Sequence, residues 1–150
     1  MDNIKLFDLY SSYIFDKLYK SFPKCINFSP PEEIHQEQDI TTLENKEKII
    51  IFSETILWLE ENDFIRIKSK IPNTQRPVEP IPFNAFICVR LSLKGLNLLT
   101  SPIPKSLNKR KKLGDEIVEH VKKGFFVEAG KLLTEAMFEF SKEKVWPITS

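Results

Sequence analysis

The chain has 150 residues, of which 41% are hydrophobic and 29% are charged, a composition that supports one folded domain with a real core. Its formal net charge of +1 excludes a strongly basic nucleic-acid binder of the histone or ribosomal kind. No segment approaches the roughly 20 apolar residues of a membrane span, and the amino terminus lacks the basic start and apolar stretch of a signal peptide, so we expect a soluble cytoplasmic protein.

Cys25 and Cys88 are the only cysteines, and they lie far apart without a second pair of metal ligands nearby. This usage favours two reduced, partly buried thiols, as in a cytosolic protein. A single disulfide between them is the alternative.

The first third of the chain predicts two helices. Apolar side chains recur at helical spacing between Ile4 and Phe22, at Phe7, Tyr10, Ile14 and Leu18. Pro23 ends this helix. Ser29 and Pro30 suit the start of a short second helix with the sequence PPEEIHQEQ.

A longer helix is predicted from about Leu43 to Asn62. Its main apolar side is formed by Ile49, Phe52, Ile56 and Leu59. Further apolar residues, including Trp58, widen this side, so we expect neighbouring elements to enclose most of the helix. The opposite side carries three carboxylates at seven-residue spacing, which form one ridge: Glu47, Glu54 and Glu61.

The residues after this helix predict a hairpin. Phe64–Lys68 alternates apolar and basic side chains, as a strand with one solvent-exposed face does, and Ala85–Leu91 forms the returning strand. Between them, Lys70–Asn84 contains four prolines, which predict an extended loop without regular pairing. Ser92 is placed to cap a short helix that follows at once, LKGLNLL.

The last third predicts two more helices from about Ser106 onward. The basic run Lys109–Lys112 is typical of a solvated helix start with Asp115 and Glu116 as counter-charges, or of a patch that binds phosphate or a membrane surface. The terminal helix carries a second apolar set, which includes Phe126, Leu133 and Phe140. Such a set predicts packing against the first helix or pairing with a second copy of the chain, and both readings stay open.

The helix-to-hairpin junction resembles that of bacterial winged-helix proteins. In that family the third helix ends in a leucine, acidic, glycine, leucine-isoleucine turn, and the second wing strand runs into a leucine-threonine-x-lysine-glycine helix start. The first pattern is matched by Leu59, Glu60, Phe64 and Ile65, and the second by Leu91, Leu93, Lys94 and Gly95. Asp63 stands where glycine is usual, and Ser92 where threonine is usual.

The resemblance implies a mainly α fold with a small antiparallel β-wing. We expect a winged helix-turn-helix core over residues 1–104 and a C-terminal helical extension over 105–150, which packs on the core or forms a dimer. By association the family also implies DNA binding, with the helix 43–62 in the major groove and the wing 66–90 on the backbone. The residues that would contact DNA are Lys46, Lys48, Ser53, Thr55, Lys68, Lys70 and Arg76.

The acidic ridge argues against that role, because three carboxylates would be repelled by a groove lined with phosphates. No pattern typical of catalysis occurs either. His35 and His120 are the only histidines, neither has a metal ligand at suitable spacing, and no glycine-rich phosphate loop is present. We predict a protein that is not an enzyme and needs no cofactor or metal.

Two hypotheses follow. The first is a non-enzymatic interaction protein that binds a basic protein surface, or a second copy of itself, through Glu47, Glu54, Glu61, Phe126, Leu133 and Phe140. The loop Pro72–Pro82 would add contacts. The second is a dimeric DNA-binding transcriptional regulator that uses the helix 43–62 and the wing 66–90.

Overall fold

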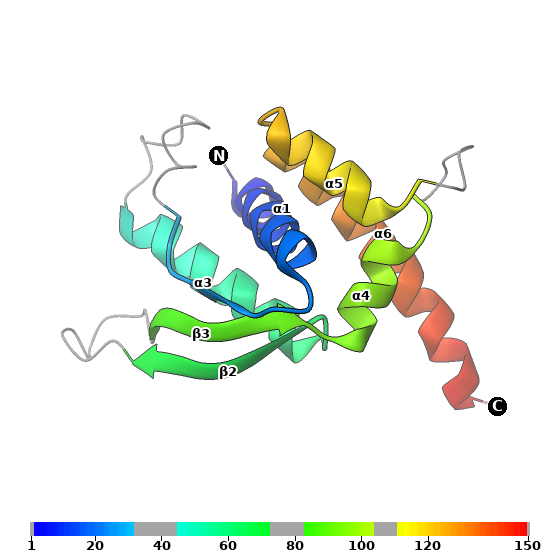
Figure 1. Ribbon diagram of the computed structural model, residues 1–150, viewed down its shortest axis with the longest axis horizontal. Coiled ribbons are helices and arrows are strands. Elements are labelled where there is room, and N and C mark those ends of the chain that lie inside the picture. Colours follow the sequence, from blue (N-terminus) through cyan, green and yellow to red (C-terminus); the bar gives the residue numbers. More distant parts are fainter. Residues whose placement is uncertain (1, 32–44, 73–82, 104–110, 150) are drawn as a thin grey trace.

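The computed structural model describes residues 2–31, 45–72, 83–103 and 111–149. Within these ranges the protein is mainly helical and contains one small antiparallel sheet (Figure 1). The elements in chain order are α1 (Asn3–Ser21), β1 (Ile26–Phe28), α3 (Asn45–Glu61), β2 (Ile65–Pro72), β3 (Phe83–Leu91), α4 (Leu93–Thr100), α5 (Leu113–Lys122) and α6 (Phe126–Thr149). The short helix predicted after Ser29 falls largely on 32–44, outside the described residues.

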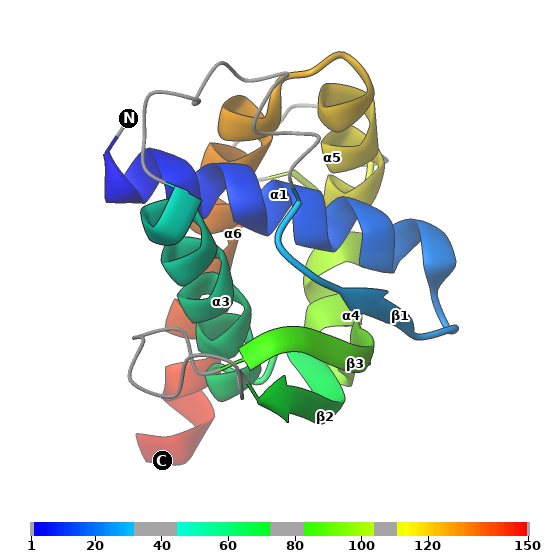
Figure 2. The same cartoon turned by 90° about the vertical axis from the view of Figure 1, so that its left-hand side faces the viewer.

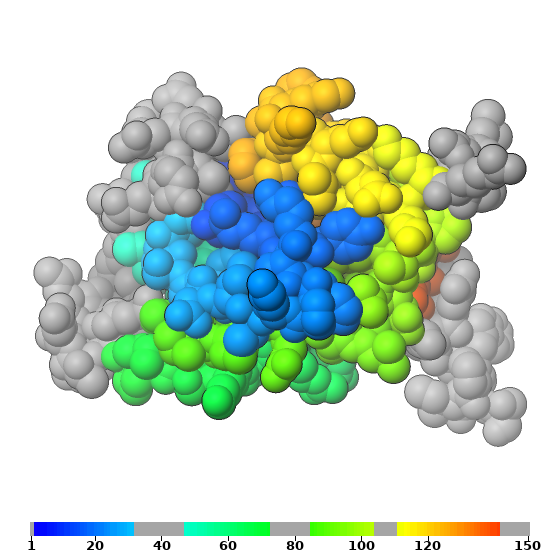
Figure 3. Space-filling model, in the orientation of Figure 1, coloured from blue at the N-terminus to red at the C-terminus, as the bar shows by residue number. Residues whose placement is uncertain are grey.

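Helix α1 occupies the centre of the molecule and contacts α3, α5 and α6 (Figure 2). Asp2 caps its start: the Asp2 carboxylate accepts a hydrogen bond from the amide of Lys5 at 2.8 Å. Because neighbours cover several of its sides, the polar residues Asp8, Ser12 and Asp16 are buried together with its apolar stripe. On one face of the molecule, α1 and β1 lie between α5 and the β2–β3 hairpin (Figure 3).

The approach of α1 to α6 depends on Gly130. A Cβ placed on this residue would overlap the backbone of Asp8, so the two helices touch backbone to backbone here. Ala129 and Leu133 of α6 are fully buried, in the same core cluster as the apolar residues of α1. The terminal helix therefore packs on the first helix, as one of the two sequence readings predicted.

The sheet has the strand order β1–β3–β2, and both pairings are antiparallel. The predicted hairpin is confirmed, with Ile65 opposite Leu91 and Ile67 opposite Val89. Both strands are longer than predicted. Strand β2 continues to Pro72 and β3 already begins at Phe83, so both extend into the segment assigned to the loop. Strand β1 was not predicted.

Cys25 and Cys88 form a disulfide bond, with 4.7 Å between their Cα atoms. The prediction of two reduced thiols is therefore wrong. The two residues meet because β1 pairs with β3, and this pairing was not visible in the sequence. The bond also removes the redox argument for a cytoplasmic location.

A β-bulge at Cys88 determines which residues of β3 face the core. The register of β3 against β1 shifts at this point, and Cys88 has a positive φ of 53°. As a result Phe86 and Val89, which a regular strand would place on opposite faces, are both fully buried. The amide of Cys88 donates a hydrogen bond to Oδ1 of Asn27 at 2.9 Å.

The turn after α3 is tied to the start of α4. Asp63 adopts a φ of 65°, in the left-handed region that favours glycine, which is the residue usual at this position in the family pattern. Ser92 caps α4 as predicted: its hydroxyl accepts from the amide of Gly95 at 3.0 Å and donates to the Asp63 carbonyl oxygen. A side chain on Gly95 would overlap the Phe64 carbonyl.

The two predicted C-terminal helices are present as α5 and α6. Helix α5 begins at Leu113, directly after Lys112, which forms a β-bridge with Pro102. The predicted start near Ser106 lies outside the described residues. In the described part of the chain, no helix has both the length and the apolar character needed to cross a membrane.

Breaking the disulfide should destabilise the fold, because the bond restricts the unfolded chain across a separation of 63 residues. We expect reduction to lower the free energy of unfolding by about 2–4 kcal/mol, measured by urea denaturation with and without dithiothreitol. The double variant Cys25→Ala/Cys88→Ala is the control, and its unfolding midpoint should not respond to dithiothreitol. Two alkylatable thiols in the oxidised wild-type protein would contradict the assignment.

Candidate functional site

Exposed aromatic rings gather where α1, α3 and α6 meet. Trp58 of α3 is 41% exposed and Phe138 of α6 is 66% exposed. The Trp58 ring packs edge to face against Phe7 of α1, with 5.3 Å between ring centroids. Exposed apolar groups that adjoin one another are more informative than scattered ones, because they often mark contact surfaces.

Two neighbouring hollows surround these rings. The hollow between α1 and α3 has a volume of about 400 Å³ and is lined by residues that include Asn3, Phe7, Ile51, Glu54, Trp58 and Glu61. The hollow between α3 and α6 has a volume of about 330 Å³ and is lined by residues that include Phe7, Trp58, Phe64, Thr134, Met137 and Phe138. Since Phe7 and Trp58 line both hollows, we treat the two hollows as one surface and call it the aromatic groove.

The charge along the aromatic groove is acidic. Among the described residues that line it, Glu54 and Glu61 are the only charged ones, and both are exposed. They belong to the ridge predicted from the sequence, and the third member, Glu47, is exposed as well. Lys94, which is not among the described lining residues, donates a hydrogen bond to the carbonyl oxygen of Asn62, which is, at 2.9 Å.

A partly buried polar contact between α1 and α6 lies beside the groove. The hydroxyl of Thr134, a lining residue, donates to a carboxylate oxygen of Asp8 at 3.1 Å. Burial raises the pKa of Asp8, although the Thr134 hydrogen bond and the nearby charge of Lys131 oppose this effect. Asp8 is therefore harder to ionise in the folded protein than in the unfolded chain.

The three apolar residues of the predicted interaction surface do not line the aromatic groove. Phe126 is 4% exposed and Leu133 is fully buried, so both belong to the core and are unavailable to a partner. Their apolar stripe is used by the contact of α6 with α1. Phe140 is half-buried and lines another hollow, with Leu93 and Lys94.

The side chains of α3 predicted to read DNA are buried wherever the structure describes them. Lys48, Ser53 and Thr55 are only 3%, 1% and 3% exposed. The Thr55 hydroxyl donates to the carbonyl oxygen of Ile51 at 2.7 Å, within α3 itself. These three side chains do not form an accessible face of α3, because the packed sides of this helix are wider than its apolar stripe.

The residues predicted to contact DNA from the wing differ in accessibility. Lys68 is exposed, whereas Lys70 forms an ion pair with Glu60 at 2.9 Å and is half-buried. Arg76 and the side chain of Lys46 lie outside the described residues. Near Lys68, the exposed residues Arg66 and Arg90 stand directly opposite each other on β2 and β3.

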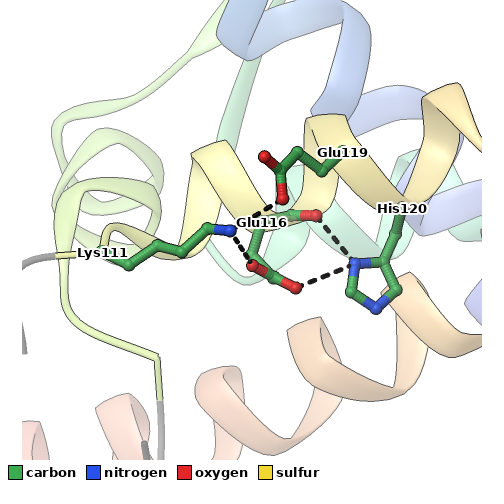
Figure 4. Close-up of polar contacts among 4 residues, drawn as sticks. All are labelled: Lys111, Glu116, Glu119 and His120. Carbon is green, nitrogen blue, oxygen red and sulfur yellow. Dashed lines mark hydrogen bonds and ion pairs between the residues drawn. The ribbon is translucent and has the colours of Figure 1, made fainter. Parts of the chain in front are cut away.

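In the described part of the basic run before α5, Lys111 forms two local ion pairs. Lys111 lies 2.6 Å from a carboxylate oxygen of Glu116 and 2.7 Å from one of Glu119 (Figure 4). These bonds raise the pKa of Lys111 and lower that of Glu119. His120 Nδ1 lies 3.2 Å from Glu116, at the i, i+4 spacing expected of a helix interaction. The counter-charge reading holds for Lys111.

Trp58 and Phe138 are the groove residues that sequence reasoning missed. Trp58 was assigned to the enclosed side of the helix, and Phe138 was left out of the apolar stripe. Phe138 could have been found from its position outside the apolar stripe of the terminal helix. A large apolar side chain that has no place in the core must lie near the surface.

Comparison with known proteins finds no matching family model, no matching curated protein and no matching solved structure.

Replacing Asp8 by asparagine should change how stability depends on pH. The pKa of Asp8 is higher in the folded protein than in the unfolded chain. Its contribution to the free energy of unfolding is therefore fully present below its unfolded-state pKa of 3.8, and it is lost as the pH rises through its folded-state pKa. The stability of Asp8→Asn relative to wild type should therefore increase as pH is raised from about 3 to 7, measured by thermal unfolding across that range.

Thr134→Val should change the pH dependence of stability in the opposite direction to Asp8→Asn. It removes the hydrogen bond that favours the charged form of Asp8, so the variant should lose more stability than wild type over the same rise in pH. Identical pH profiles for all three proteins would contradict the role assigned to the Asp8–Thr134 contact.

Proposed function

We propose that this chain is a non-enzymatic interaction protein that binds another protein through the aromatic groove. The observation that carries the proposal is the exposed Trp58 ring, which packs edge to face on the half-buried Phe7 between two hollows. Tryptophan is enriched among the residues that contribute most to protein interfaces, because it buries a large area while losing little side-chain entropy. The acidic residues along the groove favour a basic partner.

The groove corrects the interaction surface expected from the sequence rather than replacing it. Glu54 and Glu61 remain in the proposed site, while Trp58, Phe7 and Phe138 take the place of the buried Phe126 and Leu133. The result combines apolar anchors with charged residues at the margin, the usual composition of a protein interface.

A winged-helix core is our proposal for the scaffold. It is supported by the order of helix, strand, α3 and β2–β3 hairpin, and by the pairing of β1 with β3. The turn at Asp63 and the cap at Ser92 have the local conformations that the family pattern suggested. The second helix of such a core would lie within 32–44, outside the described residues.

DNA binding is the second candidate, and one observation favours it. Arg66 and Arg90 face each other across β2 and β3, a like-charge arrangement that costs stability unless an anion lies nearby. Asp63 lies 3.8 Å from Arg66, but both side chains are 67% exposed, so this pair compensates little. Lys68 adds a third exposed cation. The buried side chains of α3 speak against base reading by this helix.

The groove can be tested with ligands selected from a phage-displayed peptide library. We expect Trp58→Ser to weaken binding of the selected peptides by about 30-fold or more, because truncating a residue that dominates an interface costs about 2 kcal/mol or more, and tryptophan is enriched among such residues. Fluorescence anisotropy measures this with the purified peptides. Leu93→Ser is the matched control, since Leu93 is an equally apolar residue, 74% exposed and outside the groove.

Two results would count against the groove. One is a selection that yields no peptide above background. The other is a set of peptides that bind Trp58→Ser as tightly as wild type.

The second candidate predicts salt-dependent binding to duplex DNA that requires the sheet. The variant Arg66→Ala/Arg90→Ala should then weaken binding and reduce the slope of log affinity against log salt by about 1–2. Under our preferred proposal, affinity for duplex DNA at low salt is no better than about 10⁻⁴ M and the variant changes nothing. Anisotropy with labelled duplex across a salt series decides between them.

A further inference from the structure

From the charge and the walls of the aromatic groove, we infer that its ligand is an amphipathic helix with basic residues beside its apolar face. This inference rests on the proposed function and names the partner class for the same site. It depends on three features: the elements that form the groove, the placement of its aromatic rings and the position of its carboxylates.

The walls of the groove favour a partner whose backbone hydrogen bonds are already made. The described lining residues belong to α1, α3 and α6 or directly follow α3, and the sheet edge is not among them. An extended peptide gains affinity mainly by pairing with a free sheet edge. None of the described lining residues offers such an edge, so a bound segment must satisfy its own amides and carbonyls, as a helix does.

The placement of the aromatic rings fits the face of a helix. Phe7 and Trp58 stand between the two hollows, and Phe138 lines the hollow on the α6 side. A helix that lies in a groove uses apolar side chains at positions i, i+3 or i+4, and i+7. Side chains of this kind can fill the hollows on both sides of the Phe7–Trp58 pair.

The carboxylates of the groove indicate a partner helix with positive charge. Glu54 and Glu61 lie two turns apart on α3, roughly 10 Å along its axis, and both line the hollow between α1 and α3. A partner helix with lysine or arginine at the same seven-residue spacing would place one cation near each carboxylate. Exposed pairs of this kind contribute mainly to specificity and to the association rate.

The same carboxylates argue against a second copy of the chain as the occupant. In a twofold-symmetric dimer the same patch meets itself. Two grooves placed face to face would bring Glu54 and Glu61 of one copy toward the same residues of the other. No basic side chain among the described lining residues would compensate.

The experiment uses three synthetic peptides and anisotropy. The first peptide has an apolar helical face flanked by lysines spaced seven residues apart. The second replaces those lysines by glutamates, and the third carries central prolines that prevent helix formation. We expect only the first to bind the wild-type protein.

The protein variants localise the effect. Glu54→Lys/Glu61→Lys should weaken binding of the lysine peptide by about tenfold or more and should allow the glutamate peptide to bind. Glu47→Lys is the matched control, because it lies on the same ridge of α3 but does not line the groove. It should weaken binding of the lysine peptide far less.

Several outcomes would overturn the inference. These are tighter binding of the glutamate or proline peptide than of the lysine peptide, an equal effect of Glu47→Lys, or a wild-type dimer in sedimentation that Trp58→Ser dissociates. In each case a ligand that still requires Trp58 leaves the proposed function standing. If no ligand distinguishes wild type from Trp58→Ser, the proposed function fails as well.

Discussion

The contact between α1 and α6 at Gly130 is the constraint on which the candidate site depends. Because Gly130 has no side chain, α6 reaches the backbone of Asp8, and Thr134, one turn further on, can bond to the Asp8 carboxylate. This position of α6 brings Phe138 to the hollow that Phe7 also lines. A larger residue at position 130 would force the helices apart, and the groove would lose one of its walls.

The charge of this protein is informative only when it is resolved in space. The net value of +1 describes a nearly neutral chain, yet acidic and basic side chains occupy different surfaces. Glu54 and Glu61 line the groove on α3, whereas Arg66 and Arg90 project from the sheet. Electrostatic recognition depends on such local fields, so one fold can present one surface to a basic partner and another to an anion.

Local patterns were sufficient for much of the fold. The positions of α1, the β2–β3 hairpin and the cap at Ser92 were predicted, because helix periodicity, alternation and capping are properties of neighbouring residues. The errors came from long-range contacts. Lys48 was assigned to an accessible face but is buried, and Trp58 was assigned to the enclosed side but is exposed, since burial depends on which elements pack against α3.

The sequence by itself determined the main helices, the hairpin and the acidic ridge, each of which follows from the spacing of side chains along one segment. The tertiary structure alone decided the pairing of β1 with β3 and, with it, the Cys25–Cys88 disulfide. It also decided that Phe126 fills the core while Phe138 stays exposed. These outcomes depend on which distant segments meet, and periodicity within a single helix or strand carries no information about its partner.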